Sequence, residues 1–230
     1  MQVRLASLQS GAAAAEGTVV IIDVFRAFTT AAVALARGAR RIIMVDSLEQ
    51  ALALRRDGRG DLCIGERGGA RPAGFDFANS PTALNAADVV GKVLVQTTSN
   101  GTAGLNGATR AERLYAGAFV TAEATVRAIL RDRPALVTLV AMGRADGMRA
   151  DEDELCALYL RSRLQGRQPD PSALTMLLTS LSPPPDPKLV ASGDYPWEDR
   201  TIACEIDRVP FAIAVRAEDG LLIAGPEALT

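Results

Sequence analysis

The sequence of 230 residues contains no histidine. This absence excludes catalysis by a Ser-His-Asp or Cys-His group, a phosphohistidine intermediate and a zinc ion held by histidine. Lysine is scarce as well, since only Lys92 and Lys188 are present, which argues against a Schiff-base mechanism. General acid–base chemistry therefore falls to Asp, Glu, Lys, Tyr or Cys, or to water bound to a metal ion.

Aromatic residues make up only 4% of the chain, and its formal net charge is −2. The sequence thus offers neither a stacking surface nor a basic field for nucleic acid. The longest apolar runs, near Val19–Ile22 and Ala135–Met142, are much shorter than the roughly 20 residues of a membrane span. The three cysteines form no CxxC pair and suit a reducing compartment. We therefore expect a cytoplasmic protein that binds neither nucleic acid nor membranes; a homo-oligomer is compatible with the sequence.

The apolar pattern alternates between strands and helices. Thr18–Val24 is a continuous apolar run typical of a strand buried on both faces, and a helix at Thr29–Arg37 is expected to follow it. The other expected elements are strands at 41–46, 62–66, 92–98, 113–118 and 135–142, helices at 48–56, 102–110, 121–131, 151–165 and 169–182, and a hairpin at 211–224. Residues 67–91, rich in Gly, Pro and Asn, are expected to form a long functional loop. This alternation predicts one α/β domain, residues 1–230, with a largely parallel sheet covered on both faces.

Charged and polar residues follow several of the predicted strands. In open α/β sheets, ligands bind beyond the carboxyl ends of the strands. Asp23 and Arg26 follow the first strand, Glu66 and Arg67 the third, and the turn 98–102 the fourth. Mg²⁺ prefers carboxylate and phosphate oxygens, arginine binds an oxyanion with two hydrogen bonds, and a turn that opens a helix supplies N–H donors. These residues therefore predict a site for a divalent metal ion and an anionic ligand.

The predicted roles follow from this chemistry. Asp23 and Glu66 would hold the metal ion, and Arg26 and Arg67 would bind the anion. The turn after the fourth strand would bind phosphate oxygens through Thr98, Ser99, Asn100, Gly101 and Thr102.

Several of these residues also have a purely structural interpretation. Asp23 could cap the helix that follows it, and Asp151–Glu154 could be the acidic residues favoured in a first helical turn. The cysteines could be small buried hydrophobic residues. The convergence of several such features on strand ends favours the functional interpretation.

Five short motifs occur in an order that resembles the 2-phosphosulfolactate phosphatase family, often called ComB-like. They are Asp23-Val24-Phe25-Arg26-Ala27, Gly65-Glu66-Arg67-Gly68-Gly69, Gly74-Phe75-Asp76-Phe77-Ala78-Asn79-Ser80-Pro81, Thr97-Thr98-Ser99-Asn100-Gly101-Thr102 and Glu152-Asp153-Glu154-Leu155-Cys156-Ala157. The resemblance implies a three-layer α/β/α sandwich with a largely parallel or mixed sheet. It also implies Mg²⁺-dependent hydrolysis of 2-phospho-3-sulfolactate, or a related phosphorylated hydroxy acid, to 3-sulfolactate and phosphate. In methanogens this reaction is a step towards coenzyme M.

The resemblance adds residues to the predicted site. Asp153 or Glu152 would complete the metal site or activate water, while Gly68, Gly69, Asn79 and Ser80 would orient the small anionic substrate. Attack by a metal-activated water and a covalent aspartyl-phosphate on Asp23 both fit these residues. Two other classes also fit them: a non-catalytic protein that binds a phosphorylated ligand, and a metal-dependent lyase or isomerase of phosphorylated hydroxy acids.

Overall fold

One sheet runs through the computed structural model, which describes residues 1–181 and 184–228. Within these ranges it has ten strands in the spatial order β1-β8-β2-β7-β9-β10-β3-β6-β4-β5. The strands are β1 (Gln2–Ser7), β2 (Gly17–Ile22), β3 (Arg41–Met44), β4 (Leu62–Gly65), β5 (Phe77–Ala78), β6 (Val93–Thr97), β7 (Ala111–Gly117), β8 (Leu136–Ala141), β9 (Phe211–Glu218) and β10 (Leu221–Ala228).

The strand β2 is central to one half of the sheet. All six of its residues are buried, and it pairs in parallel with β7 on one side and β8 on the other. Because such a strand has neighbours along both edges and helices on both faces, every position favours an apolar side chain. The strand predicted at Thr18–Val24 is confirmed, with its burial.

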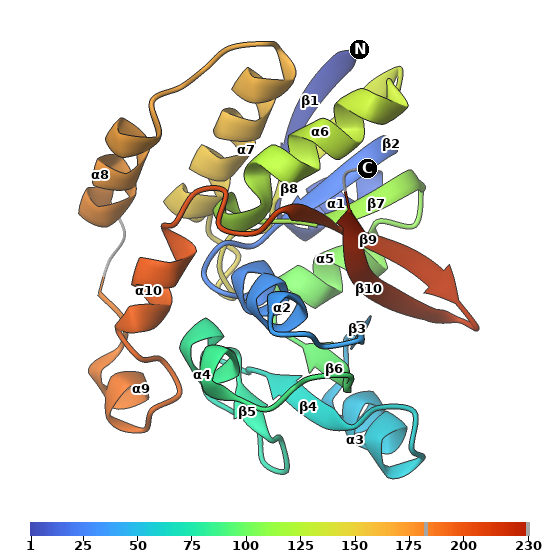
Figure 1. Ribbon diagram of the computed structural model, residues 1–230, viewed down its shortest axis with the longest axis vertical. Coiled ribbons are helices and arrows are strands. Elements are labelled where there is room, and N and C mark those ends of the chain that lie inside the picture. The colour runs from blue at the N-terminus through green and yellow to red at the C-terminus, as the bar shows by residue number, and fades with distance from the viewer. Residues whose placement is uncertain (182–183, 229–230) are drawn as a thin grey trace.

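A hairpin joins the two parallel halves of the sheet (Figure 1). Its first strand, β9, pairs antiparallel with β7, and its second strand, β10, pairs antiparallel with β3. The hairpin turns at Asp219 and Gly220, both with positive φ, as the sequence predicts. The sheet is therefore mixed.

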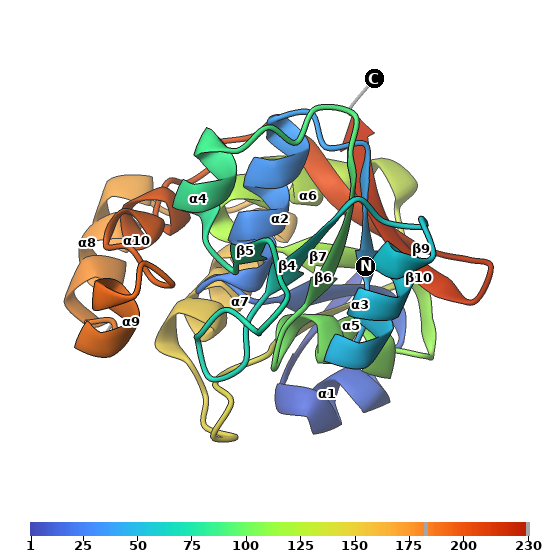
Figure 2. The ribbon, with the colours of Figure 1, turned by 90° about the horizontal axis from the view of Figure 1, so that it is seen from below.

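Helices cover both faces of the sheet (Figures 1 and 2). Val19 and Ile21 of β2 pack in one apolar cluster, whereas Val20 and Ile22 pack in another. The first cluster includes residues of α1 (Leu8–Ala14), α2 (Ala27–Ala36), α4 (Pro81–Ala86) and α5 (Gly101–Gly107). The second cluster includes residues of α6 (Ala122–Asp132) and α7 (Asp151–Leu164). A third cluster includes residues of α3 (Leu48–Arg56). This arrangement confirms the predicted three-layer α/β/α fold class.

Two helix starts have the predicted chemistry. The Ser47 side chain accepts a hydrogen bond from the backbone N–H of Gln50 and so caps α3. The first turn of α7 contains Asp151, Glu152, Asp153 and Glu154, which the helix dipole favours there.

The structure also differs from the sequence-based prediction. Residues 67–91 hold β5 and α4 rather than an unbroken loop, because the Ser80 side chain accepts from Ala83 N–H and Pro81 occupies the first turn. The prediction also missed β1, α1, α9 (Pro187–Ala191) and α10 (Glu198–Ala203), which are short or half-exposed and carry weak periodicity. The helix predicted at 169–182 is α8 (Pro171–Leu181), and residue 182 lies outside the described residues.

Within the two described ranges, no helix combines the length and the apolar character needed to cross a membrane.

Candidate active site

The carboxyl ends of two parallel pairs of strands, β2 with β8 and β4 with β6, meet at a cavity of about 360 Å³. Asp23 follows β2, Glu66 follows β4, Ser99 and Asn100 follow β6, and Gly143 follows β8. The lining also contains Phe25, Arg26, Gly68, Gly69, Asn79, Arg144, Ala145, Glu152, Pro184, Pro185, Asp186, Leu189 and Tyr195. The structure thus brings residues from distant parts of the sequence together at the sheet edge where ligands of α/β proteins bind.

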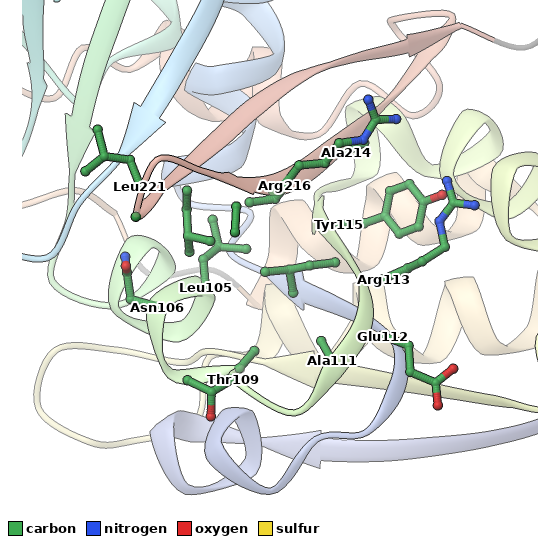
Figure 3. A pocket seen from close by; sticks show the side chains of 16 residues that line it. Leu105, Asn106, Thr109, Ala111, Glu112, Arg113, Tyr115, Ala214, Arg216 and Leu221 are labelled. Carbon is green, nitrogen blue, oxygen red and sulfur yellow. The ribbon is translucent and has the colours of Figure 1, made fainter. Parts of the chain in front are cut away.

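A larger groove of about 790 Å³ lies elsewhere, between α5, β7 and the β9–β10 hairpin (Figure 3). Figure 3 shows the guanidinium groups of Arg113 and Arg216 at the Tyr115 end of this groove, away from Leu105 and Leu221. Arg113 pairs with carboxylates at Asp132 and Glu227. None of the predicted site residues lines the groove. The smaller cavity, with its several carboxylates, is therefore the candidate site.

Asp23 is the most perturbed carboxylate in the cavity. Its side chain is buried, and its Oδ1 atom accepts a hydrogen bond from Ala27 N–H at 3.0 Å. Burial raises the pKa of Asp23 to about 7, and the Glu66 and Glu152 carboxylates add to the rise. The bond to Ala27 N–H opposes it. Asp23 thus caps the start of α2, as its structural interpretation proposed, and also faces the cavity.

Asp153 lies behind this carboxylate. Its Oδ1 atom accepts from Val24 N–H at 2.8 Å, and its Oδ2 atom accepts from Gly143 N–H at 2.9 Å. Burial raises the pKa of Asp153 well above its usual range, and the Asp23 charge adds to that rise. Asp153 is absent from the cavity lining in the described ranges. It therefore connects the ends of β2 and β8 from beneath the cavity.

Glu66 connects two loops of the cavity wall. Its Oε1 atom accepts from Ser99 N–H at 2.7 Å, and its Oε2 atom accepts from Gly69 N–H at 2.8 Å. The Ser99 hydroxyl lies 3.2 Å from the same Oε2 atom. These bonds fix the Glu66 carboxylate beside the Gly68-Gly69 turn.

The two predicted arginines are placed differently. Arg26 lines the cavity, whereas Arg67 does not. The Arg67 guanidinium donates to the carbonyl oxygens of Glu66 and Asp46 and to the hydroxyl of Thr97. Arg67 therefore stabilises the loop that carries Glu66, and its predicted contact with an anion stays a prediction.

The turn after β6 divides into two groups. Ser99 and Asn100 line the cavity, and the Asn100 amide donates to the Gly143 carbonyl at 3.0 Å. Thr98 and Thr102 are buried and bond to each other, since each hydroxyl accepts from the other residue's N–H group. The two threonines thus shape the turn from within.

Gly101, in the same turn, allows the start of α5 to lie close to Asp23 and to the start of α2. A Cβ atom there would lie 2.7 Å from Ala27 Cβ and 2.8 Å from Asp23 Oδ2. We expect Gly101→Ala to lower the free energy of unfolding by about 1–3 kcal/mol, because it forces α5 away from the start of α2. Gly225→Ala is the control, since its Cβ would meet nothing within 4 Å. Thermal unfolding checks this, and equal melting temperatures for the two variants would contradict it.

The orientation of Asn79 is fixed by a residue that the sequence analysis did not select. Gln96 Nε2 donates to the Ala27 carbonyl at 2.9 Å and to Asn79 Oδ1 at 3.2 Å. Because a carbonyl only accepts, the Gln96 atom facing it must be the nitrogen, and the Asn79 atom facing that nitrogen must be the oxygen. The Asn79 NH₂ group is therefore the end available to the cavity, as a donor. Ser80, by contrast, is buried and bonds to Asp199.

Three carboxylates are candidates for holding the predicted metal ion. Asp23, Glu66 and Glu152 line the same cavity. Burial raises the pKa of Glu152, and Asp151 adds to the rise. In the part of the chain that the structure describes, however, no group of three His, Cys, Asp or Glu side chains is close enough to hold a metal ion. A three-carboxylate cage is therefore not preformed.

Sequence reasoning missed several residues of the site. Arg144 and Tyr195 line the cavity, and Asp199 bonds to Arg26 from α10. Gly143 directly follows the predicted strand at 135–142, so the rule of strand ends points to it. Arg144, Tyr195 and Asp199 carry no local signal, since their segments show neither clear periodicity nor a motif.

The fold and the cavity define an α/β protein with an acidic, arginine-containing ligand site at the carboxyl ends of its parallel strands. A family model described as 2-phosphosulpholactate phosphatase matches residues 5–187. The chain therefore belongs to the 2-phosphosulfolactate phosphatase family, which confirms the resemblance of its motifs.

Curated relatives agree with this assignment. A probable 2-phosphosulfolactate phosphatase from Parasynechococcus marenigrum is 40% identical over 148 residues, which are 64% of this chain and 61% of the relative. One from Caldicellulosiruptor saccharolyticus is 36% identical over 144 residues, 61% of this chain and 59% of the relative. One from Thermoplasma acidophilum is 35% identical over 156 residues, which are 68% of this chain and 69% of the relative. The match spans about three fifths of the length of the first two relatives.

Proposed function

We propose that the protein is a Mg²⁺-dependent phosphatase that hydrolyses 2-phospho-3-sulfolactate, or a related phosphorylated hydroxy acid, to the hydroxy acid and phosphate. The observation that carries this proposal is the buried Asp23, whose pKa is about 7, beside Glu66 and Glu152 in one small cavity. Family membership and the names of the relatives support the substrate class.

The donor set of the cavity fits a magnesium ion. Mg²⁺ is commonly bound through one or two carboxylates together with substrate oxygens and water, so a three-carboxylate cage is not required. Asp23 and Glu66 would hold it, with Glu152 in the same lining, and a cation there would offset the burial and the carboxylate repulsion that raise the pKa of Asp23. When bound, the ion would polarise the phosphoryl oxygens and lower the pKa of a coordinated water.

The chain's own groups supply the remaining steps. Asn79 presents its NH₂ group and Arg26 its guanidinium to the cavity, which suits the equatorial oxygens of a phosphoryl group. Arg144 lines the same cavity and suits a second anionic group, such as a carboxylate or sulfonate. Asp153 and Arg67 hold the strand ends and the Glu66 loop in place. Tyr195 and Leu189 line the same cavity and would limit the access of water on their side.

Phosphate release from a panel of phosphorylated hydroxy acids tests the proposal. We expect release with Mg²⁺, its loss in EDTA, and its recovery when Mg²⁺ is restored in excess. Ligand-dependent stabilisation without phosphate release would instead indicate a binding protein. Loss of substrate without free phosphate would indicate a lyase or isomerase. Release that persists in EDTA would overturn the metal dependence alone.

A further inference from the structure

A buried ion pair connects the cavity to the C-terminal part of the chain. Arg26 Nη1 lies 2.7 Å from Asp199 Oδ2, and the two side chains are 2% and 0% exposed. Asp199 belongs to α10, beyond residues 5–187 that the family model matches. Removing one partner of such a pair leaves an uncompensated buried charge, which strongly destabilises the folded state.

The contacts of Arg26 fix its guanidinium from several directions. Nη1 donates hydrogen bonds to the Asp194 carbonyl and to Asp199 Oδ2, each at 2.7 Å. The ring centroid of Tyr195 lies 3.6 Å from Arg26 Cζ, which fixes the plane of the group. Nη2 makes a longer contact of 3.3 Å with the Gly69 carbonyl. Since Nη1 is fully used, the Nη2 side is the one that Arg26 can offer to a ligand.

The second oxygen of Asp199 bonds to the segment that directly follows Asn79. Asp199 Oδ1 accepts from the Ser80 hydroxyl at 2.7 Å and from Thr82 N–H at 3.0 Å. Both donors lie at the start of α4, directly after Asn79. One carboxylate therefore connects Arg26, the segment that carries Asn79, and α10.

We propose that Asp199 is a positioning residue for the reaction: it fixes the Arg26 guanidinium so that its remaining N–H groups meet the oxyanion of the substrate. This inference rests on the proposed phosphatase function. Donors that are already oriented need no rearrangement as charge develops in the transition state, which is how they accelerate a reaction. The segment that carries α10 is then part of the working site rather than an appendage.

A double-mutant cycle of Arg26→Met and Asp199→Asn tests the proposal. We expect Asp199→Asn to lower kcat/KM by about 10- to 100-fold in the wild-type background and by less than about 3-fold in the Arg26→Met background. Asp219→Asn is the matched control with unchanged kcat/KM, because Asp219 is exposed at the tip of the β9–β10 hairpin and lies outside the cavity lining. Equal losses in the two backgrounds would overturn the proposal, because Asp199 would then act independently of Arg26.

Stability measurements separate positioning from folding. Arg26→Met leaves the buried Asp199 charge without a cation, so its melting temperature should fall by about 6 °C or more, and adding Asp199→Asn should restore at least half of that loss. Arg26→Lys keeps the charge but not the fixed planar group, so it should unfold close to the wild type and still lose kcat/KM as Arg26→Met does. Wild-type activity in Arg26→Lys would contradict an oriented guanidinium.

Binding of inorganic phosphate, measured by calorimetry, makes the test independent of hydrolysis. We expect Asp199→Asn to weaken it by about tenfold, through the loss of one oriented charged donor, and Asp219→Asn to leave it unchanged. If the wild type releases no phosphate from any monoester, the proposed function fails, and the binding comparison still decides the role of Asp199. Unchanged phosphate affinity in Asp199→Asn overturns the positioning role, and a wild type that neither releases nor binds phosphate overturns both.

Discussion

Asp23→Asn is expected to lower the rate of phosphate release by about a thousandfold or more. The substitution keeps the size of the side chain and its ability to accept from Ala27 N–H, but removes the charge that would hold the metal ion. Losing one central group of a preorganised polar site typically costs a factor of about 10² to 10⁴ or more in kcat. Steady-state phosphate release with saturating Mg²⁺ measures the effect.

Asp219→Asn provides the matched control for this variant. It makes the same chemical change at the exposed tip of the β9–β10 hairpin, outside the cavity lining, and should keep the wild-type rate. An Asp23→Asn protein that retains more than about a tenth of the wild-type rate would show that this carboxylate is not central to the reaction.

The stability of the metal-free protein is expected to fall as the pH rises from about 4 to about 7. The pKa of Asp23 is about 7 in the folded chain against 3.8 in the unfolded reference, so the folded state binds more protons across this interval. The stability gained from protonated Asp23 is therefore fully present below the pKa of the unfolded state and is lost as the pH rises through the pKa of the folded state. About three pKa units correspond to a loss of up to about 4 kcal/mol in the free energy of unfolding.

The Asp23→Asn variant should therefore be more stable than the wild type at alkaline pH. The substituted side chain of Asp23→Asn cannot ionise. In EDTA at pH 8 we therefore expect the melting temperature of this variant to exceed that of the wild type by about 8–16 °C, if the whole of the pH-dependent loss is removed. Near pH 4 the two proteins should have the same melting temperature. Mg²⁺ should raise the melting temperature of the wild type at pH 8 and leave that of Asp23→Asn unchanged. Parallel pH profiles for the two proteins would show that Asp23 ionises normally in the folded state.

A cation bound at this site would relieve the electrostatic strain of its buried carboxylates. Asp23 is buried next to like charges, an arrangement that costs stability and that a core chosen for stability alone would avoid. Its persistence at the end of a fully buried strand fits the general observation that perturbed carboxylates gather at functional sites. Loss of activity together with a gain of stability in one variant would be the measurable sign of this trade.

Parts of the fold could be predicted because their signals are local. The run at β2 is apolar at every position because both faces of the strand are covered, and Ser47 marks the start of α3 because its side chain accepts from Gln50 N–H. The hairpin turn at Asp219 and Gly220 follows from the backbone angles that these residues tolerate. Short elements such as α4 and α10 were missed because six residues carry too little periodicity to stand out.

The candidate site was predictable only as a set of strand ends. The rule that ligands bind at the carboxyl ends of parallel strands selected Asp23, Glu66 and the turn at Ser99, and the structure brings these three together. It could not give the direction of each side chain. Arg67 follows Glu66 directly, yet its guanidinium bonds to the Asp46 carbonyl on the other side of the loop.

The order of strands and helices, the motifs of the family and the choice of acidic and arginine residues are properties of the sequence, since they depend on neighbours within a few positions. The roles of individual charges are properties of the tertiary structure. Arg26 and Asp199 are 173 positions apart, and their pairing exists only because the start of α2 and α10 come together in the folded chain. A charged side chain acts according to the water it loses and the partners it gains, and both depend on residues that are distant along the chain.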